Sequence, residues 1–120
     1  MFGNILVGLV ALLHMYFLVL EMFYWTKPKG LKAFGNTLEN AKISEKLAAN
    51  QGLYNGFLSA GLVWGLFETT PEFAQSIKIF FLGCVIVAGL YGAYSVSRKI
   101  LFIQAVPAMI ALIFVLSKFI

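Results

Sequence analysis

The fold is decided by residues 4–25, NILVGLVALLHMYFLVLEMFYW, an apolar run interrupted by only a few polar side chains. A helix of about 20 mostly apolar residues crosses the roughly 30 Å hydrocarbon core of a bilayer. Neither a basic stretch nor a small-residue cleavage pattern accompanies this run. We therefore expect a retained transmembrane helix rather than a removed signal peptide.

The composition extends this conclusion to the whole chain. Hydrophobic residues make up 61% of the 120 residues and charged residues 12%, whereas a typical soluble domain has about 25% charged residues. A soluble protein of this size cannot bury so much apolar surface, because small domains keep a large surface-to-volume ratio. The lipid bilayer is therefore the expected environment of most of the chain.

Three further apolar runs are long enough to cross the bilayer. Each crossing must be helical, because unpaired backbone groups in lipid cost several kcal/mol each. The sequence therefore predicts an all-α polytopic membrane protein, a four-transmembrane-helix bundle that forms a single membrane domain over residues 1–120. The predicted spans are residues 4–25, 47–67, 77–96 and 100–116.

The connection between the first two spans is the only sizeable one. It opens with residues 27–30, KPKG, a turn signal that ends the first helix. Asn36 followed by Glu39 resembles a capping box and predicts a short amphipathic cytoplasmic helix. In the last span, Pro107 is expected to kink the helix and free a carbonyl group one turn earlier.

The basic residues predict the orientation of the protein. Residues 26–46 and 97–99 contain seven of the nine Lys and Arg residues. Lys and Arg collect in cytoplasmic loops, so we expect a multi-pass protein of the plasma membrane, a bacterial inner membrane, with its N-terminus outside and both basic loops cytoplasmic. These residues form no stripe on a folded face, so the net charge of +4 does not indicate nucleic-acid binding.

Polar side chains of all four predicted spans fall at one depth, towards the cytoplasm, while the outer half is nearly bare of them. Polar and ionisable residues within spans nearly always face a bundle interior or a wet cavity. The sequence therefore predicts a ligand- or ion-binding cavity open to the cytoplasm. Its expected residues are His14, Glu21, Trp25, Asn50, Gln51, Tyr54, Asn55, Tyr91, Tyr94, Arg98 and Gln104.

Glu21 is the acidic member of this layer. It is either a protonatable or cation-binding group, or a structural partner of Arg98 or of interfacial water. His14 lies seven residues earlier on the same face, and either relays protons to Glu21 or packs as a hydrogen-bonded histidine. The amides of the second span either join helices or line the cavity.

Small residues recur every four positions in the second and third spans. Such spacing lets helices approach closely. We expect the second and third helices to be neighbours, or one of these faces to be the seam of a homo-oligomer. The residues concerned are Gly52, Gly56 and Ala60, then Ala88, Gly89, Gly92 and Ala93.

The sequence indicates no metal site and no cofactor. One His and one Glu fall short of ordinary ligand sets, and the single Cys84 excludes an internal disulfide. His14 and Glu21 lie about 10 Å apart along a helix axis, which is too far for a direct hydrogen bond. Without a nucleophile elbow or phosphate loop, an enzyme ranks last, although the point stays open.

Four segments also carry a family resemblance. They are residues 14–25 (HMYFLVLEMFYW), 47–57 (LAANQGLYNGF), 80–92 (FFLGCVIVAGLYG) and 97–104 (SRKILFIQ). The chain resembles a family of small bacterial and fungal membrane proteins known as domain of unknown function 1304. The resemblance covers essentially the whole chain and implies a four-span fold, without an established activity.

Two functions suit this arrangement. The first is a transporter or channel-like protein, a homo-oligomer with a polar, protonatable cavity open to the cytoplasm. The alternative is a lipid-, quinone- or amphiphile-binding or accessory membrane protein without transport, because aromatic side chains beside amides suit an amphiphile with a polar head. The expected partners are the lipid bilayer, a second copy of the chain, and a small amphiphile or ion.

Overall fold

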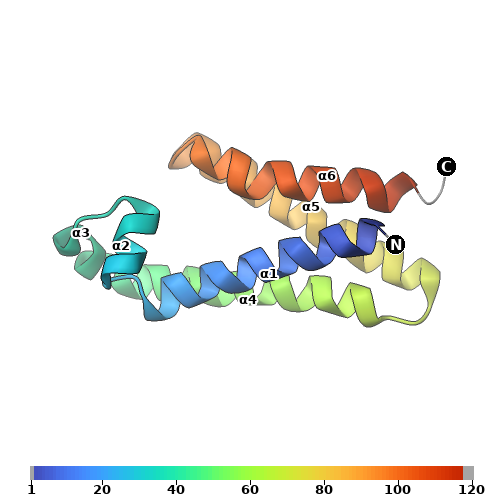
Figure 1. Ribbon diagram of the computed structural model, residues 1–120, viewed down its shortest axis with the longest axis horizontal. Helices are drawn as coiled ribbons and strands as arrows, with labels where there is room; N and C mark the ends of the chain where they lie inside the picture. Colours follow the sequence, from blue (N-terminus) through green and yellow to red (C-terminus); the bar gives the residue numbers. More distant parts are fainter. Residues whose placement is uncertain (1, 118–120) are drawn as a thin grey trace. The chain divides into compact units, whose positions relative to one another are not determined.

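A computed structural model describes residues 2–117, and this part of the chain is helical without strands (Figure 1). A helix occupies each of the four predicted spans, and two short helices occupy the connection between the first two. The elements in order are α1 (Phe2–Phe23), α2 (Pro28–Phe34), α3 (Leu38–Ile43), α4 (Glu45–Phe67), α5 (Pro71–Ser95), the π-helical segment η1 (Leu101–Ala105) and α6 (Val106–Leu116).

The chain divides into two compact units. Unit 1 combines Met1–Ala11 with Leu58–Ile120, and unit 2 is Leu12–Phe57. Helices α1 and α4 are each divided between the two units: one part of each helix belongs to unit 1 and the other part to unit 2. The predicted single membrane domain over residues 1–120 stays a prediction.

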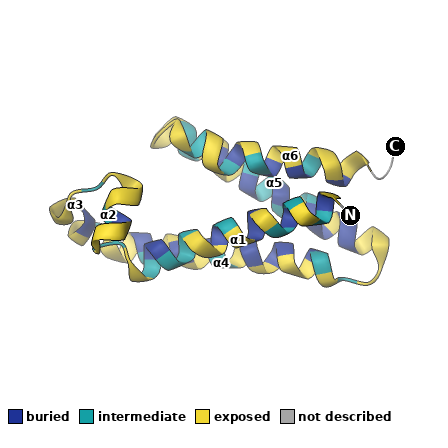
Figure 2. Ribbon diagram, viewed as in Figure 1, coloured by how far each residue is buried: buried dark blue, intermediate teal, exposed yellow. Residues whose placement is uncertain are grey.

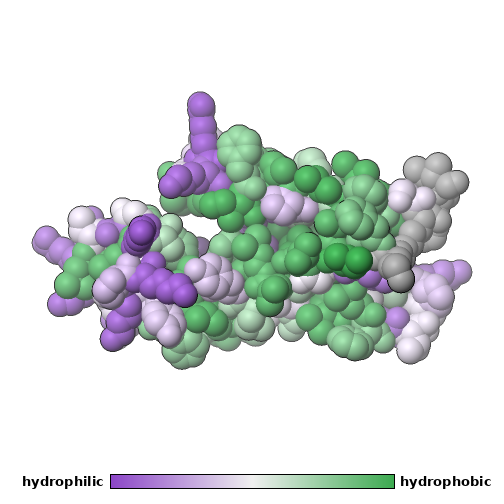
Figure 3. Space-filling model, in the orientation of Figure 1, coloured by the Kyte–Doolittle hydropathy of each residue, from purple (hydrophilic) through white to green (hydrophobic). Residues whose placement is uncertain are grey.

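Two helices, α1 and α5, are long and apolar enough to cross a membrane. The last apolar segment, Leu101–Leu116, is shorter. Helix α4 has 23 residues but is less apolar, because Asn50, Gln51 and Asn55 lie in its first half. Many large apolar residues are nevertheless exposed, while a group of hydrophilic residues surrounds α2 and α3 (Figure 3). Four membrane crossings stay a prediction.

The loop between α1 and α4 differs from its prediction in two details. Pro28 does not form a turn but takes the first position of α2, where its missing N–H group costs nothing. Gly30 lies inside this helix, against the carbonyl oxygen of Tyr24, where a β-carbon would overlap that oxygen. The turn that ends α1 therefore comes before residue 28.

The predicted capping box at Asn36 is wrong by one residue. Gly35 ends α2 in the left-handed conformation, with φ 65°, and the Asn36 N–H group donates to the Leu31 carbonyl oxygen at 3.0 Å. Asn36 thus completes the end of α2. The cap of α3 is Thr37, whose Oγ1 accepts a bond from the Asn40 N–H group at 3.2 Å.

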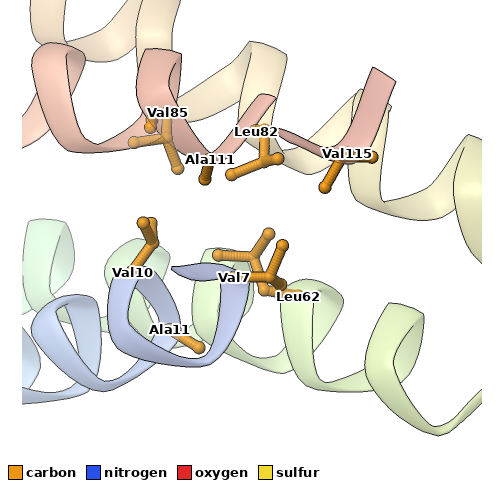
Figure 4. Packing of buried hydrophobic residues seen from close by; sticks show 9 residues of the cluster. Val7, Val10, Ala11, Leu62, Leu82, Val85, Ala111 and Val115 are labelled. Carbon is orange, nitrogen blue, oxygen red and sulfur yellow. The ribbon is translucent and has the colours of Figure 1, made fainter. Parts of the chain in front are cut away.

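The core of unit 1 contains small and branched apolar side chains from α1, α4, α5 and α6. Its labelled members face one another in Figure 4, and buried and exposed positions alternate along each helix in Figure 2. The buried members are Val7, Val10, Ala11, Leu62, Leu82, Val85, Ala108, Ala111 and Val115.

The small residues also set helix contacts in unit 1. A β-carbon at Gly89 would lie 2.7 Å from the backbone nitrogen of Ala105, so α5 and η1 approach very closely. Helix α4 contacts α5 through Gly61, which lies against Phe81, and through Gly65, rather than through Ala60, which is exposed. The predicted second and third spans are thus neighbours, but α4 contacts α5 through the face of Gly61 and Gly65 and not through the predicted face that includes Ala60.

The predicted irregularity before Pro107 is a wider helical turn. The Val106 N–H group donates to the carbonyl oxygen of Leu101, five residues earlier, so that η1 is π-helical. Pro107 follows within the first two positions of α6. A π-helical turn is one of the recognised ways in which a helix accommodates such a break.

Candidate functional site

The candidate site is built around the carboxyl group of Glu21, near the end of α1. Glu21 is only 2% exposed. Its Oε2 accepts a bond from Gln51 Nε2 at 2.8 Å, and its Oε1 accepts a bond from Asn55 Nδ2 at 2.5 Å. Each oxygen of the buried carboxyl group therefore has one amide partner from α4.

Helix geometry explains why α4 presents both amides together. Gln51 and Asn55 are four residues apart and so lie on one face of the helix. Between them, a β-carbon at Gly52 would lie 2.8 Å from Met22 Cγ and 3.0 Å from Glu21 Cβ. One turn later, a β-carbon at Gly56 would lie 2.7 Å from Leu18 Cδ1. The glycines predicted to mediate packing therefore bring α4 against α1, close enough for the amides to reach the carboxyl group.

Trp25 fixes the end of α1 one turn beyond Glu21. Its indole Nε1 donates to Ser44 Oγ at 3.2 Å, and its ring lies 4.9 Å from the ring of Phe34. Since Ser44 directly precedes α4, this bond holds the start of α4 beside the end of α1. Trp25 therefore positions the site and does not bond to the carboxyl group.

His14 is fully buried, two turns before Glu21 on α1. Its ring meets that of Phe17 edge-on, with centroids 5.3 Å apart. The separation of about 10 Å along the helix is too long for a direct hydrogen bond to Glu21. A proton relay between the two residues stays a prediction.

Two predicted cavity residues of α4 lie outside this contact. Asn50 and Tyr54 are both exposed, and the Tyr54 ring packs on Phe57 with centroids 5.8 Å apart. They occupy a different strip of the helix surface from Gln51 and Asn55. The sequence predicted one depth for all four but could not tell which of them point at α1.

The remaining predicted site residues belong to unit 1. Tyr91, Tyr94 and Arg98 are exposed at and after the end of α5, and Gln104 is half-buried in η1. Within Leu12–Phe57, the structure records no ion pair for Glu21. The pairing of Glu21 with Arg98 and the participation of these residues in one cavity stay predictions.

The two amides can serve either protonation state of the carboxyl group. Asn and Gln side chains contain an NH₂ donor and a carbonyl acceptor. The donors complement an ionised carboxylate, and after rotation of an amide its carbonyl oxygen accepts a bond from a protonated carboxyl. No cluster of three His, Cys, Asp or Glu side chains that could hold a metal ion occurs among residues 2–117.

The sequence interpretation missed a second set of buried polar contacts, in unit 1. Lys78 Nζ donates to Asn4 Oδ1 at 2.7 Å, and Gln75 Nε2 donates to the carbonyl oxygen of Val115 at 2.5 Å. Gln75 and Lys78 are both buried near the start of α5, in the half expected to be nearly bare of polar side chains. Their spacing of three residues was the available signal, because it places both on one helix face.

Comparison with known proteins identifies the family. A family model described as "Protein of unknown function (DUF1304)" matches residues 8–116. The uncharacterized protein YpaA of Lactococcus lactis subsp. lactis (strain IL1403) is 32% identical over 107 residues, which cover 88% of this chain and 88% of that protein. No solved structure matches this chain. The resemblance noted in the sequence is confirmed, and the chain belongs to the DUF1304 family of proteins of unknown function.

Proposed function

We propose that this protein is a small proton-conducting transporter or channel-like protein of the plasma membrane, in which Glu21 binds and releases the conducted proton. In this proposal the chain crosses the bilayer four times, with the N-terminus outside and residues 26–46 and 97–99 in the cytoplasm, and acts as a homo-oligomer. One observation carries the proposal: the Glu21 carboxyl group is 2% exposed and bonded to two amides, in a helix apolar enough to cross a membrane.

The cost of this arrangement supports a functional role. An acidic side chain within an apolar span is expensive, and such residues commonly mark ion or proton pathways. Helix packing alone does not need a carboxyl group, because Gln51 and Asn55 could bond to an amide in its place. A carboxyl group adds the ability to gain and lose a proton, while its amide partners can bond to both forms.

The burial of Glu21 favours a proton over a larger cation as the bound species. Both carboxyl oxygens are already engaged by Gln51 and Asn55, and little of the side chain is accessible. A proton binds to one oxygen without displacing either amide, whereas an organic cation needs α1 and α4 to separate. The proton itself is therefore the transported species in this proposal.

A flux experiment tests the proposal. The purified protein is reconstituted into liposomes with a pH-sensitive dye inside, and an imposed pH gradient is followed over time. We expect the wild type to dissipate the gradient faster than empty liposomes, and Glu21→Gln to abolish the difference. The matched control is Glu39→Gln, which removes an exposed acid from α3 and should leave flux unchanged.

Two results would contradict the proposal. One is a Glu21→Gln variant that folds and dissipates the gradient as fast as the wild type. The other is a wild-type protein that adds no flux to that of empty liposomes.

Binding of an amphiphile without transport is the second candidate function. The exposed pair Asn50 and Tyr54 favours it, since an amide and a phenol one turn apart on the outer face of α4 suit a polar head group. This candidate predicts a lipid or quinone that co-purifies with the wild type and is lost from an Asn50→Leu/Tyr54→Leu variant, without proton flux in either protein.

A further inference from the structure

The segment between α1 and α4 has a strongly basic surface. Residues 27–46 contain five lysines and two glutamates, which leaves a net charge of +3. All five lysines are exposed, and in Figure 3 a group of hydrophilic side chains surrounds α2 and α3. We call residues 27–47 the basic corner. Its lysines are Lys27, Lys29, Lys32, Lys42 and Lys46.

Large apolar side chains are exposed within the same corner. Ile43 is 79% exposed and Leu47 is 75% exposed. Ile43 is the last residue of α3 and Leu47 lies in the first turn of α4, and each directly follows an exposed lysine, Lys42 and Lys46. A surface with lysines beside protruding aliphatic side chains is typical of segments that lie at a membrane interface.

Exposed apolar side chains also occur further along α4. Tyr54 and Phe57 are both more than half exposed, and the exposed Asn50 lies between Leu47 and Tyr54. A bilayer suits such a mixed surface, because aromatic and polar side chains lie near the interface and aliphatic ones next to lipid. The exposed apolar side chains beside the lysines therefore favour lipid over an acidic protein as the partner of the lysines.

Specific contacts hold the basic corner in place. The Trp25 indole bonds to Ser44 and packs on Phe34, which ties both short helices to the end of α1. Ala41 of α3 is fully buried. The Lys29 ammonium group lies 5.7 Å from the centre of the Tyr16 ring of α1. The lysines are thus presented by a packed structure, which lowers the entropy lost when a ligand binds.

We propose that the basic corner binds anionic phospholipids, with lysine ammonium groups on the lipid phosphates and with Ile43 and Leu47 against the adjoining acyl chains. The proposal rests on the membrane placement given above. Lysines near an anionic surface attract its lipids. Removal of three of the five lysines is therefore expected to abolish most of the preference for anionic lipid.

Trp25 provides a reporter inside the corner. In a Trp64→Phe background it is the sole tryptophan. The full-length protein is reconstituted into phosphatidylcholine bilayers that contain either brominated phosphatidylglycerol or brominated phosphatidylcholine, whose bromine atoms quench nearby indole fluorescence. We expect several-fold stronger association of the phosphatidylglycerol, and loss of the preference in 1 M salt, where the Debye length is about 3 Å.

The variants separate lipid preference from membrane insertion. Lys32→Gln/Lys42→Gln/Lys46→Gln should bring the preference close to one, while the control Lys99→Gln, an exposed lysine of unit 1, should retain it. Equal quenching by the two lipids in the parent protein overturns the lipid proposal and leaves membrane insertion intact. Absence of quenching by either lipid overturns the membrane placement as well. If the triple variant keeps the full preference for phosphatidylglycerol, other residues cause that preference, and the proposal is also overturned.

Discussion

Replacement of Gly52 by alanine tests the contact on which the candidate site depends. The new β-carbon would lie 2.8 Å from Met22 Cγ, 3.0 Å from Glu21 Cβ and 3.3 Å from the Leu18 carbonyl oxygen. Ordinary carbon–carbon contact needs about 3.5 Å, so α4 has to move away by roughly 0.7 Å. The bond from Gln51 to Glu21, now 2.8 Å, would then lengthen to about 3.5 Å, beyond good hydrogen-bond geometry.

The expected loss of stability follows from these contacts. Overpacking at a tight interface costs about 1–3 kcal/mol, and alanine returns about 1 kcal/mol through its higher helix propensity. The matched control is Gly83→Ala in α5, where an added β-carbon meets nothing within 4 Å. It receives the propensity gain alone. The two variants should therefore differ by about 1–3 kcal/mol in free energy of unfolding.

Unfolding in mixed micelles, followed by helix content and by tryptophan fluorescence, measures this difference. The variants are compared in the same detergent, so that the propensity gain affects both alike. If Gly52→Ala stabilises the protein as much as Gly83→Ala does, α1 and α4 do not approach closely and the geometry assigned to the site is incorrect. Proton flux and stability should both fall in Gly52→Ala, and neither should fall in Gly83→Ala.

Three more predictions are checked by the same unfolding measurement. Asn55→Leu should cost about 1–3 kcal/mol of unfolding free energy, because it leaves a buried carboxyl oxygen unpaired. Gln51→Leu should cost less, since Gln51 is exposed and water can take its place. Equal losses in the two variants would contradict the assigned burial. Ser59→Ala should remove an interhelical bond and about 0.6 kcal/mol, unlike Ser95→Ala, which affects only a bond within its own helix. Gly35→Ala should cost about 1 kcal/mol through its left-handed backbone; an unchanged stability would mean that α2 ends differently.

The positions of the long helices could be predicted because hydropathy is a local property. Every predicted span coincides with a helix to within a few residues, apart from the first turns of α5, which begin at Pro71 rather than near residue 77. Those turns contain Glu72, Gln75 and Lys78, and these polar residues interrupt the apolar run by which the span was predicted. Burial of Gln75 and Lys78 against other helices compensates for that polarity.

The capping error has a similar origin. Asn36 and Thr37 are both good N-cap residues, and only the first has Glu39 at the spacing of a capping box. The choice depends on where the preceding helix ends. Gly35 ends α2 and engages Asn36 in that end, so the cap passes to Thr37.

By itself the sequence determined that the protein is helical, that its apolar segments suit a bilayer, and that Glu21 shares a level with a group of amides. Hydropathy and residue spacing decide these properties, and both can be read along a single chain. The tertiary structure decided which amides meet the carboxyl group. That choice depends on the rotation of α4 about its axis, which the fit of Gly52 and Gly56 against α1 sets and which no local pattern specifies.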